Sequence, residues 1–123
     1  MTPEEFVDVL REVVLTRAVG STLSAIESPP GRRPRQELIL ENAWYRELSE
    51  QDREHLRRVA TMVAHQTLFG LLAVLDGARV VENTAEKGVF KLSFRQGDHE
   101  WELNPPDGVP LHDILNQPSD ARE

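Results

Sequence analysis

Cysteine is absent from the 123 residues of the sequence. This absence excludes disulfides, thiolate metal ligands and cysteine nucleophiles together. The sequence also carries no visible export signal, because its first residues, "MTPEEFVDVL", are acidic where a signal peptide is basic. We therefore expect a cytoplasmic protein without a cleaved leader.

Long hydrophobic runs are missing as well. The longest run, residues 68–75, contains eight apolar or glycine residues, whereas a helix needs about 20 to cross a bilayer. This length predicts that no segment anchors the chain in a membrane.

The motifs of common catalytic and nucleotide-binding sites are absent. There is no glycine-rich phosphate loop, no G-x-G-x-x-G, no G-x-S-x-G and no H-E-x-x-H. No two of the four histidines have the i, i+4 spacing of a helical zinc site. We expect neither a cofactor nor a metal ion.

Basic residues are outnumbered, since 14 lysines and arginines stand against 21 acidic residues and the net charge is −7. Nucleic-acid binding needs clustered cations, so this balance argues against it. The acidity favours solubility and either a basic protein partner or a cationic ligand. One basic cluster, with Arg32, Arg33 and Arg35 among prolines, predicts an exposed loop over residues 28–35. That loop could hold an anion or an acidic partner, although a solvated connection is the simpler interpretation.

The remaining composition suits a globular protein. The hydrophobic fraction is 39% and the charged fraction 28%, which argues against wholesale disorder. We expect one domain over residues 1–123, ending in a polar tail at residues 118–123.

Two amphipathic helices are predicted in the first 48 residues. The first begins at Thr2 as N-cap, with Pro3 in the first turn, and has Gly20 as its stop. The second covers residues 36–48, where apolar residues recur every four positions at Leu40, Trp44 and Leu48.

A third helix, long and central, is predicted from Ser49 as N-cap to Gly77 as C-cap. Charged residues keep one face wet as far as His65, whereas residues 68–75 have no polar side and predict a half that is enclosed all round. Gly70 costs about 1 kcal/mol in mid-helix relative to alanine, so it indicates the close approach of another backbone.

The period of the pattern changes to two after Gly77. Residues 78–83, 89–94 and 99–103 are predicted strands, with Gln96–Gly97 as the turn between the last two. This register puts apolar residues on one face and opposite charges on the other. The predicted pairs are Phe94 with His99, Leu92 with Trp101, Phe90 with Leu103, Arg95 with Asp98, Ser93 with Glu100, and Lys91 with Glu102.

The predicted fold is therefore α+β: three N-terminal helices, then a three-stranded antiparallel meander, then a short C-terminal helix after Pro110. The apolar face of the sheet is expected to pack on the long helix.

Few residues suggest a reactive site. His65 and Asp76 share a helix face but lie about 16 Å apart along the axis, so they cannot touch. His112 and Asp113 are adjacent, which favours an exposed pair on a terminal helix over a catalytic dyad. The candidate ligand pocket lies between the long helix and the sheet and consists of His65, Phe69, His99 and Trp101.

The favoured hypothesis is a non-enzymatic protein-binding domain that forms a homodimer. A two-fold contact between long helices would cover the apolar surplus, and an inhibitor resembling an immunity protein fits the acidity and size. The alternative is a small-molecule binder or enzyme that uses the His65 and His99 pocket. The residues predicted to self-associate are Leu68, Gly70, Leu71 and Val74.

Overall fold

The computed structural model describes residues 1–118, so residues 119–123, most of the predicted polar tail, lie outside the described chain. The contacts divide the chain into two compact units. Unit 1 joins Met1–Val13 to the segment from Gln66 onward, and unit 2 is Val14–His65. In sequence, unit 2 is therefore an insertion between the two segments of unit 1.

The chain begins with three consecutive helical elements, α1 (Pro3–Val9), the π-helical η1 (Leu10–Thr16) and α2 (Arg17–Glu27). The predicted N-cap is confirmed: the Glu5 N–H donates to Thr2 Oγ1 at 3.1 Å, and the Thr2 N–H donates to the Glu5 carboxylate at 3.0 Å. The predicted stop at Gly20 is wrong, because α2 continues for seven more residues. It ends where the sequence forces it to, since Ser28 precedes a proline and leaves the helical conformation, with ψ 86°.

Two further helices, α3 (Gln36–Arg46) and α4 (Glu50–Leu75), follow. Ser49 caps α4 as predicted, because its Oγ accepts the Asp52 N–H at 3.1 Å. Gly77, with φ 77°, is the predicted C-cap. The Ala78 N–H donates to the Ala73 carbonyl at 2.8 Å, and the Gly77 N–H donates to the Val74 carbonyl at 3.1 Å. Together these two bonds form a Schellman motif.

The sheet has two strands, not three: β1 (Ser93–Gln96) pairs antiparallel with β2 (His99–Glu102). The prediction of a strand at residues 78–83 is wrong, since no residue between α4 and β1 is in a strand. Local side-chain bonds shape this irregular segment instead. The Gly88 N–H donates to the Glu82 carboxylate at 2.8 Å, and the Thr84 hydroxyl donates to the Glu86 carbonyl at 2.7 Å. Such bonds compete with the ladder that a third strand would need.

The predicted register of the hairpin is also wrong, by two residues. The observed pairs are Ser93 with Glu102, Phe94 with Trp101, Arg95 with Glu100, and Gln96 with His99. The turn is Gly97–Asp98, and Gly97 takes φ 60° at its first position, which a glutamine would adopt at a cost. Because the shift is even, Phe94 and Trp101 stay on one face, with ring centroids 5.8 Å apart.

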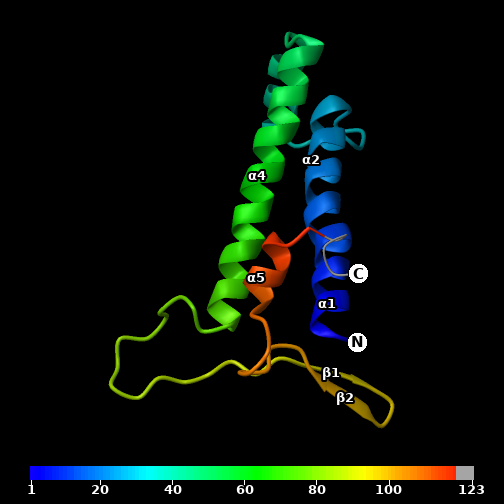
Figure 1. Ribbon diagram of the computed structural model, residues 1–123. Coiled ribbons are helices and arrows are strands. Elements are labelled where there is room, and N and C mark those ends of the chain that lie inside the picture. The colour runs from blue at the N-terminus through cyan, green and yellow to red at the C-terminus, as the bar shows by residue number, and fades with distance from the viewer. Residues whose placement is uncertain (119–123) are drawn as a thin grey trace. The chain divides into compact units, whose positions relative to one another are not determined.

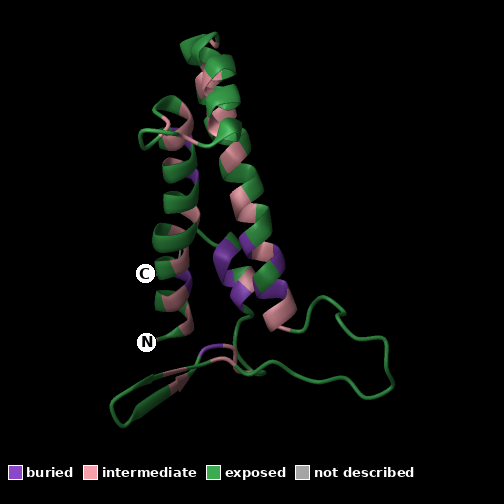
Figure 2. Ribbon diagram, turned by 180° about the vertical axis from the view of Figure 1, so that it is seen from behind, coloured by how far each residue is buried: buried purple, intermediate pink, exposed green. Residues whose placement is uncertain are grey.

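The core of unit 1 is built around α5 (Leu111–Asn116), the short helix predicted after Pro110. Figure 2 shows buried residues gathered on α5 and on the adjoining end of α4, and Figure 1 shows α5 beside α1. The fully or nearly fully buried apolar residues of this unit are Val7, Leu68, Leu72, Ala73, Leu103, Leu111, Ile114 and Leu115.

Arg11 fastens the C-terminal end of α5. One guanidinium nitrogen donates to three carbonyls, those of Ile114 at 2.7 Å, Leu115 at 2.9 Å and Gln117 at 2.7 Å. The other terminal nitrogen contacts the Asp8 carboxylate at 2.7 Å, which fixes the side chain. The last carbonyls of a helix have no partner within the helix, so Arg11 satisfies groups that would otherwise need water.

Unit 2 uses the same device at two helix ends. The Asn42 amide donates to the Ile26 carbonyl at 2.8 Å and the Glu27 carbonyl at 3.1 Å, at the end of α2. Arg53 donates to the Arg46 carbonyl at 3.4 Å, at the end of α3. The Arg53 guanidinium also stacks 4.5 Å from the centre of the Tyr45 ring, a cation–π contact.

The predicted fold is thus wrong in its sheet and in its helices. Five helical elements precede the sheet where three were expected, and the sheet has two strands. The expected enclosure of α4 is also wrong. Leu71 is 56% exposed. The predicted apolar face of the sheet is itself open, since Phe90 is exposed and Phe94 is half-buried. The structure is α+β, with a two-stranded antiparallel sheet.

We expect Arg11→Met to lower the free energy of unfolding by about 1–3 kcal/mol, because hydrogen bonds that involve a charged group are lost. Urea unfolding followed by circular dichroism measures the change. The matched control is Arg17→Met, at an exposed arginine of α2, which should stay within about 0.5 kcal/mol of the parent. Equal losses in both variants would show that Arg11 does not fasten α5.

Candidate functional site

The four residues of the predicted pocket are divided between the two units. His65 is half-buried on α4 in unit 2, and Phe69 is half-buried on α4 in unit 1. His99 and Trp101 lie on β2 with ring centroids 5.8 Å apart, and His99 is exposed. A pocket that uses both histidines therefore stays a prediction.

A different histidine, His112, takes part in a polar cluster of unit 1. Asp76, just after α4, accepts two hydrogen bonds on Oδ2 from His112 of α5: one from the backbone N–H at 2.9 Å and one from ring Nδ1 at 2.7 Å. The side chains are 5% and 15% exposed. The ring stands edge-on to Phe69 with centroids 5.3 Å apart. The expectation that His112 lies on an exposed surface is therefore wrong.

The cluster joins two helix ends. The N-cap of α5 is Pro110, whose side chain accepts no hydrogen bond. The first turn of α5 therefore takes its acceptor from Asp76, 36 positions earlier. A carboxylate that holds an imidazole also occurs in acid–base catalysis. Here, however, the buried Asp76 holds the ring in place at 2.7 Å, and the second ring nitrogen lies 3.5 Å from the exposed Asp113 carboxylate. A proline at an N-cap position was the sequence signal that a distant acceptor was needed.

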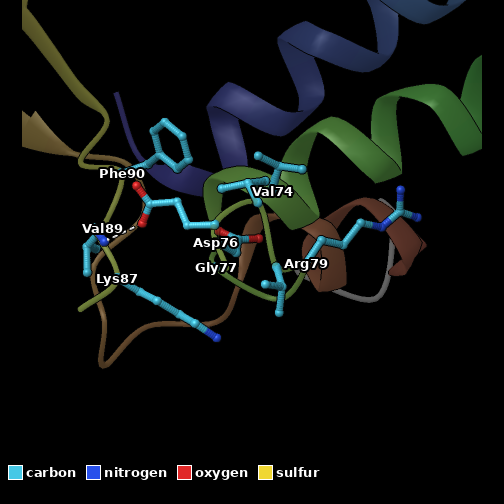
Figure 3. Close-up of a pocket in the computed structure, with 11 residues that line it drawn as sticks. Val74, Asp76, Gly77, Arg79, Lys87, Val89 and Phe90 are labelled. Carbon is cyan, nitrogen blue, oxygen red and sulfur yellow. Dashed lines mark hydrogen bonds between the residues drawn. The ribbon is translucent and has the colours of Figure 1, made fainter. Parts of the chain in front are cut away.

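A cavity of about 280 Å³ lies between the end of α4 and the irregular segment that follows it. Figure 3 shows Val74, Val89 and Phe90 around it, with the Arg79 side chain extending away from Val89 and Phe90. Its volume falls just below the range of typical small-molecule sites, and its walls come largely from irregular chain. Neither His65 nor His99 lines it.

The side of α4 at Gly70 is occupied by the chain itself. A methyl group placed on Gly70 would lie 2.7 Å from the guanidinium of Arg79. Of the residues predicted to self-associate, Leu68 and Gly70 are buried, Val74 is half-buried and Leu71 is exposed. The space beside Gly70 thus holds an arginine side chain rather than a neighbouring backbone.

Large exposed apolar residues occur in both units, and those of unit 2 all lie on helices. Helix α3 has no buried residue at all. Its side towards α2 carries Leu38, Asn42 and Tyr45, which are half-buried. Its opposite side, here called the α3 outer face, consists of Ile39, Leu40, Ala43 and Trp44, all exposed.

The first part of α4 shows the same feature, because Val59, Met62 and Val63 are each more than half exposed. Monomeric proteins rarely leave apolar side chains gathered in this way, and such surfaces mark contacts with other molecules. The predicted loop at residues 28–35 lies outside the helices, with Arg32, Arg33 and Arg35 exposed.

Helix α4 is long and apolar enough to cross a membrane by length and composition, and 22% of its apolar window is buried. The core helices of soluble proteins pass the same test. Polar residues interrupt the window at mid-helix, at His65, Gln66 and Thr67, where burial in hydrocarbon is costly.

Comparison with known proteins provides no relative: no family model, no curated protein and no solved structure matches this chain. Among residues 1–118, no three histidine or acidic side chains gather closely enough to hold a metal ion. A functional proposal for this chain must therefore be argued from its own exposed residues.

A double-mutant cycle tests the link between α4 and α5. We expect Asp76→Ala and His112→Ala each to destabilise unit 1, with a coupling free energy of about 1–3 kcal/mol in the double variant. Urea unfolding of the four proteins gives this value. Asp113→Ala is the control, since that side chain is 57% exposed and should change stability by less than about 0.5 kcal/mol. Additive losses at positions 76 and 112 would contradict the link.

Gly70→Ala tests whether the space beside this glycine is needed by a neighbouring backbone or only holds the Arg79 side chain. The obstructing atom is the far end of the flexible Arg79 side chain, which can move, while alanine improves helix propensity by about 1 kcal/mol. We therefore expect equal or greater thermal stability and an unchanged oligomeric state, measured by calorimetry and light scattering. A marked loss of stability, or loss of a dimer, would instead support a neighbouring backbone at this glycine.

Proposed function

We propose that this chain is a non-enzymatic protein-binding domain that uses the α3 outer face. The observation that supports the proposal is the exposure of this face: Leu40 is 60% exposed and Trp44 47% exposed on a helix with no buried residue. When a partner covers an exposed tryptophan and leucine, their apolar surface leaves water, and the free energy of this burial favours binding.

The geometry explains how α3 can serve as a binding helix. The Asn42 amide ties α3 to the end of α2, and Arg53 ties its C-terminal end to α4 through Tyr45 and the Arg46 carbonyl. The helix is therefore positioned before any partner arrives, and a partner does not bear the cost of ordering it. Its exposed apolar side chains are spaced by three and four residues, as in other helices that bind a partner through one face.

The acidic residues of unit 1 offer a second contact for a basic partner. Among the described residues of that unit, twelve are acidic and five are lysine or arginine. Charges at the rim of an interface mainly speed association and select partners, whereas buried apolar anchors provide most of the affinity. The α3 outer face therefore carries the proposal.

Substitution of Leu40 by glutamate tests the function. Partners retained by the tagged full chain from native extract are identified, purified and titrated against the parent, Leu40→Glu and Val89→Glu. Val89 is an 81% exposed apolar residue of unit 1, so its variant matches the change in charge and hydrophobicity.

We expect Leu40→Glu to weaken the purified complex at least about tenfold, the effect of losing a central apolar anchor. Val89→Glu should change affinity less than about twofold. Circular dichroism verifies that both variants remain helical. Equal affinity for the parent and Leu40→Glu would refute the proposal.

A further inference from the structure

We propose that the molecule bound to the α3 outer face is a second copy of this chain, joined through the same face. Two α3 helices then pack antiparallel about a two-fold axis. This inference rests on the proposed function, because it names the partner that the face binds.

The distribution of charge favours a second copy. Unit 2 contains eight arginines and seven acidic residues, so it is nearly neutral, and the described part of unit 1 holds the excess of acids. Two copies that met through unit 1 would repel each other. Two copies that meet through unit 2 avoid this repulsion. A strongly charged partner gains little from so balanced a surface.

The two ends of α3 also suit an antiparallel arrangement. Its first turn is acidic at Glu37, and its last turn is basic at Arg46. A two-fold axis at the level between Glu41 and Asn42 puts Glu37 of one helix at the level of Arg46 of the other. The dipoles of the two helices then also run in opposite directions.

The same axis brings large and small side chains together. Leu40 lies at the level of the partner's Ala43, and the partner's Leu40 lies at the level of Ala43. Ile39 and Trp44 flank this centre on either side of the face. A leucine opposite an alanine lets two helices approach within about 8–10 Å, the ordinary distance between packed helices.

The interface is small. An eleven-residue helix is about 16 Å long at 1.5 Å per residue, so one pair of α3 helices lies at the low end of specific interfaces. The dimer should therefore be weak and depend on concentration in the micromolar range.

The absence of cysteine from the chain permits a clean crosslinking test. Leu40→Cys and Ala43→Cys are made separately in the full chain, one of them isotope-labelled, and mixed under oxidising conditions. Facing positions on paired helices lie within the Cα distance that a disulfide spans, whereas each cysteine and its own symmetry mate are offset along the axis by about 4.5 Å. The mixed disulfide should therefore exceed the share that random pairing gives.

The control is Ser21→Cys, at an exposed position of α2 in the same unit, which reports disulfides formed by chance collision. Sedimentation equilibrium of the parent should show a reversible dimer, and Leu40→Glu should raise its dissociation constant at least about tenfold. A parent that stays monomeric throughout the micromolar range would overturn the inference. So would Leu40→Cys and Ala43→Cys crosslinking no better than Ser21→Cys, or homodisulfides in excess.

Failure of this inference is distinguishable from failure of the proposed function. A monomeric parent whose purified heterologous partner is still lost on Leu40→Glu refutes the second copy and leaves the protein-binding face standing. A Leu40→Glu variant that affects neither a dimer nor any purified complex refutes both.

Discussion

A six-residue helix is held at both ends by side chains from elsewhere in the sequence, and unit 1 depends on it. Asp76 accepts the hydrogen bonds at the start of α5, and Arg11 donates those at its end. Isolated helices of this length do not form in water, because one or two turns do not recover the cost of nucleation. The buried leucines and isoleucine of α5 can therefore fill the core only while both ends are satisfied.

The same requirement explains the polar contacts elsewhere in the chain. The side-chain amide nitrogen of Asn104 donates to the carbonyls of Leu75, at the end of α4, and of Phe90. Its side-chain oxygen, Oδ1, accepts the Leu92 N–H. One side-chain amide thus joins the end of α4 to the residues that precede β1. Together with Asn42 and Arg53 in unit 2, it shows that several helix ends are closed by a side chain distant in sequence, as unpaired carbonyls require.

This division between local and distant partners explains how far sequence reasoning reached. The caps at Thr2, Ser49 and Gly77 were predictable, because both partners of each bond lie within a few residues. The contacts of Arg11 and of Asp76 were not, because each joins positions that no periodicity relates. The hairpin was placed correctly on the chain but its register was not, because the turn was centred one residue too early and the left-handed position belongs to Gly97.

The candidate surface was predictable only in part. The spacing of Leu40 and Trp44 predicted a helical stripe, but a stripe does not say whether it faces the protein or the solvent. Helix α3 has apolar residues on two sides. The side with Asn42 faces the protein, because the Asn42 amide donates to the carbonyls at the end of α2. That bond could not be read from the pattern, since an asparagine among apolar residues is ordinarily taken as exposed.

The insertion of unit 2 within unit 1 sets the order in which the chain can fold. Arg11 and Ile114 lie 103 positions apart. The N-terminal helix can therefore pack against α5 only after nearly the whole chain has been synthesised. Unit 2 is a continuous segment and is complete by His65. The proposed binding surface, the α3 outer face, would thus form first during synthesis, and the core of unit 1 last.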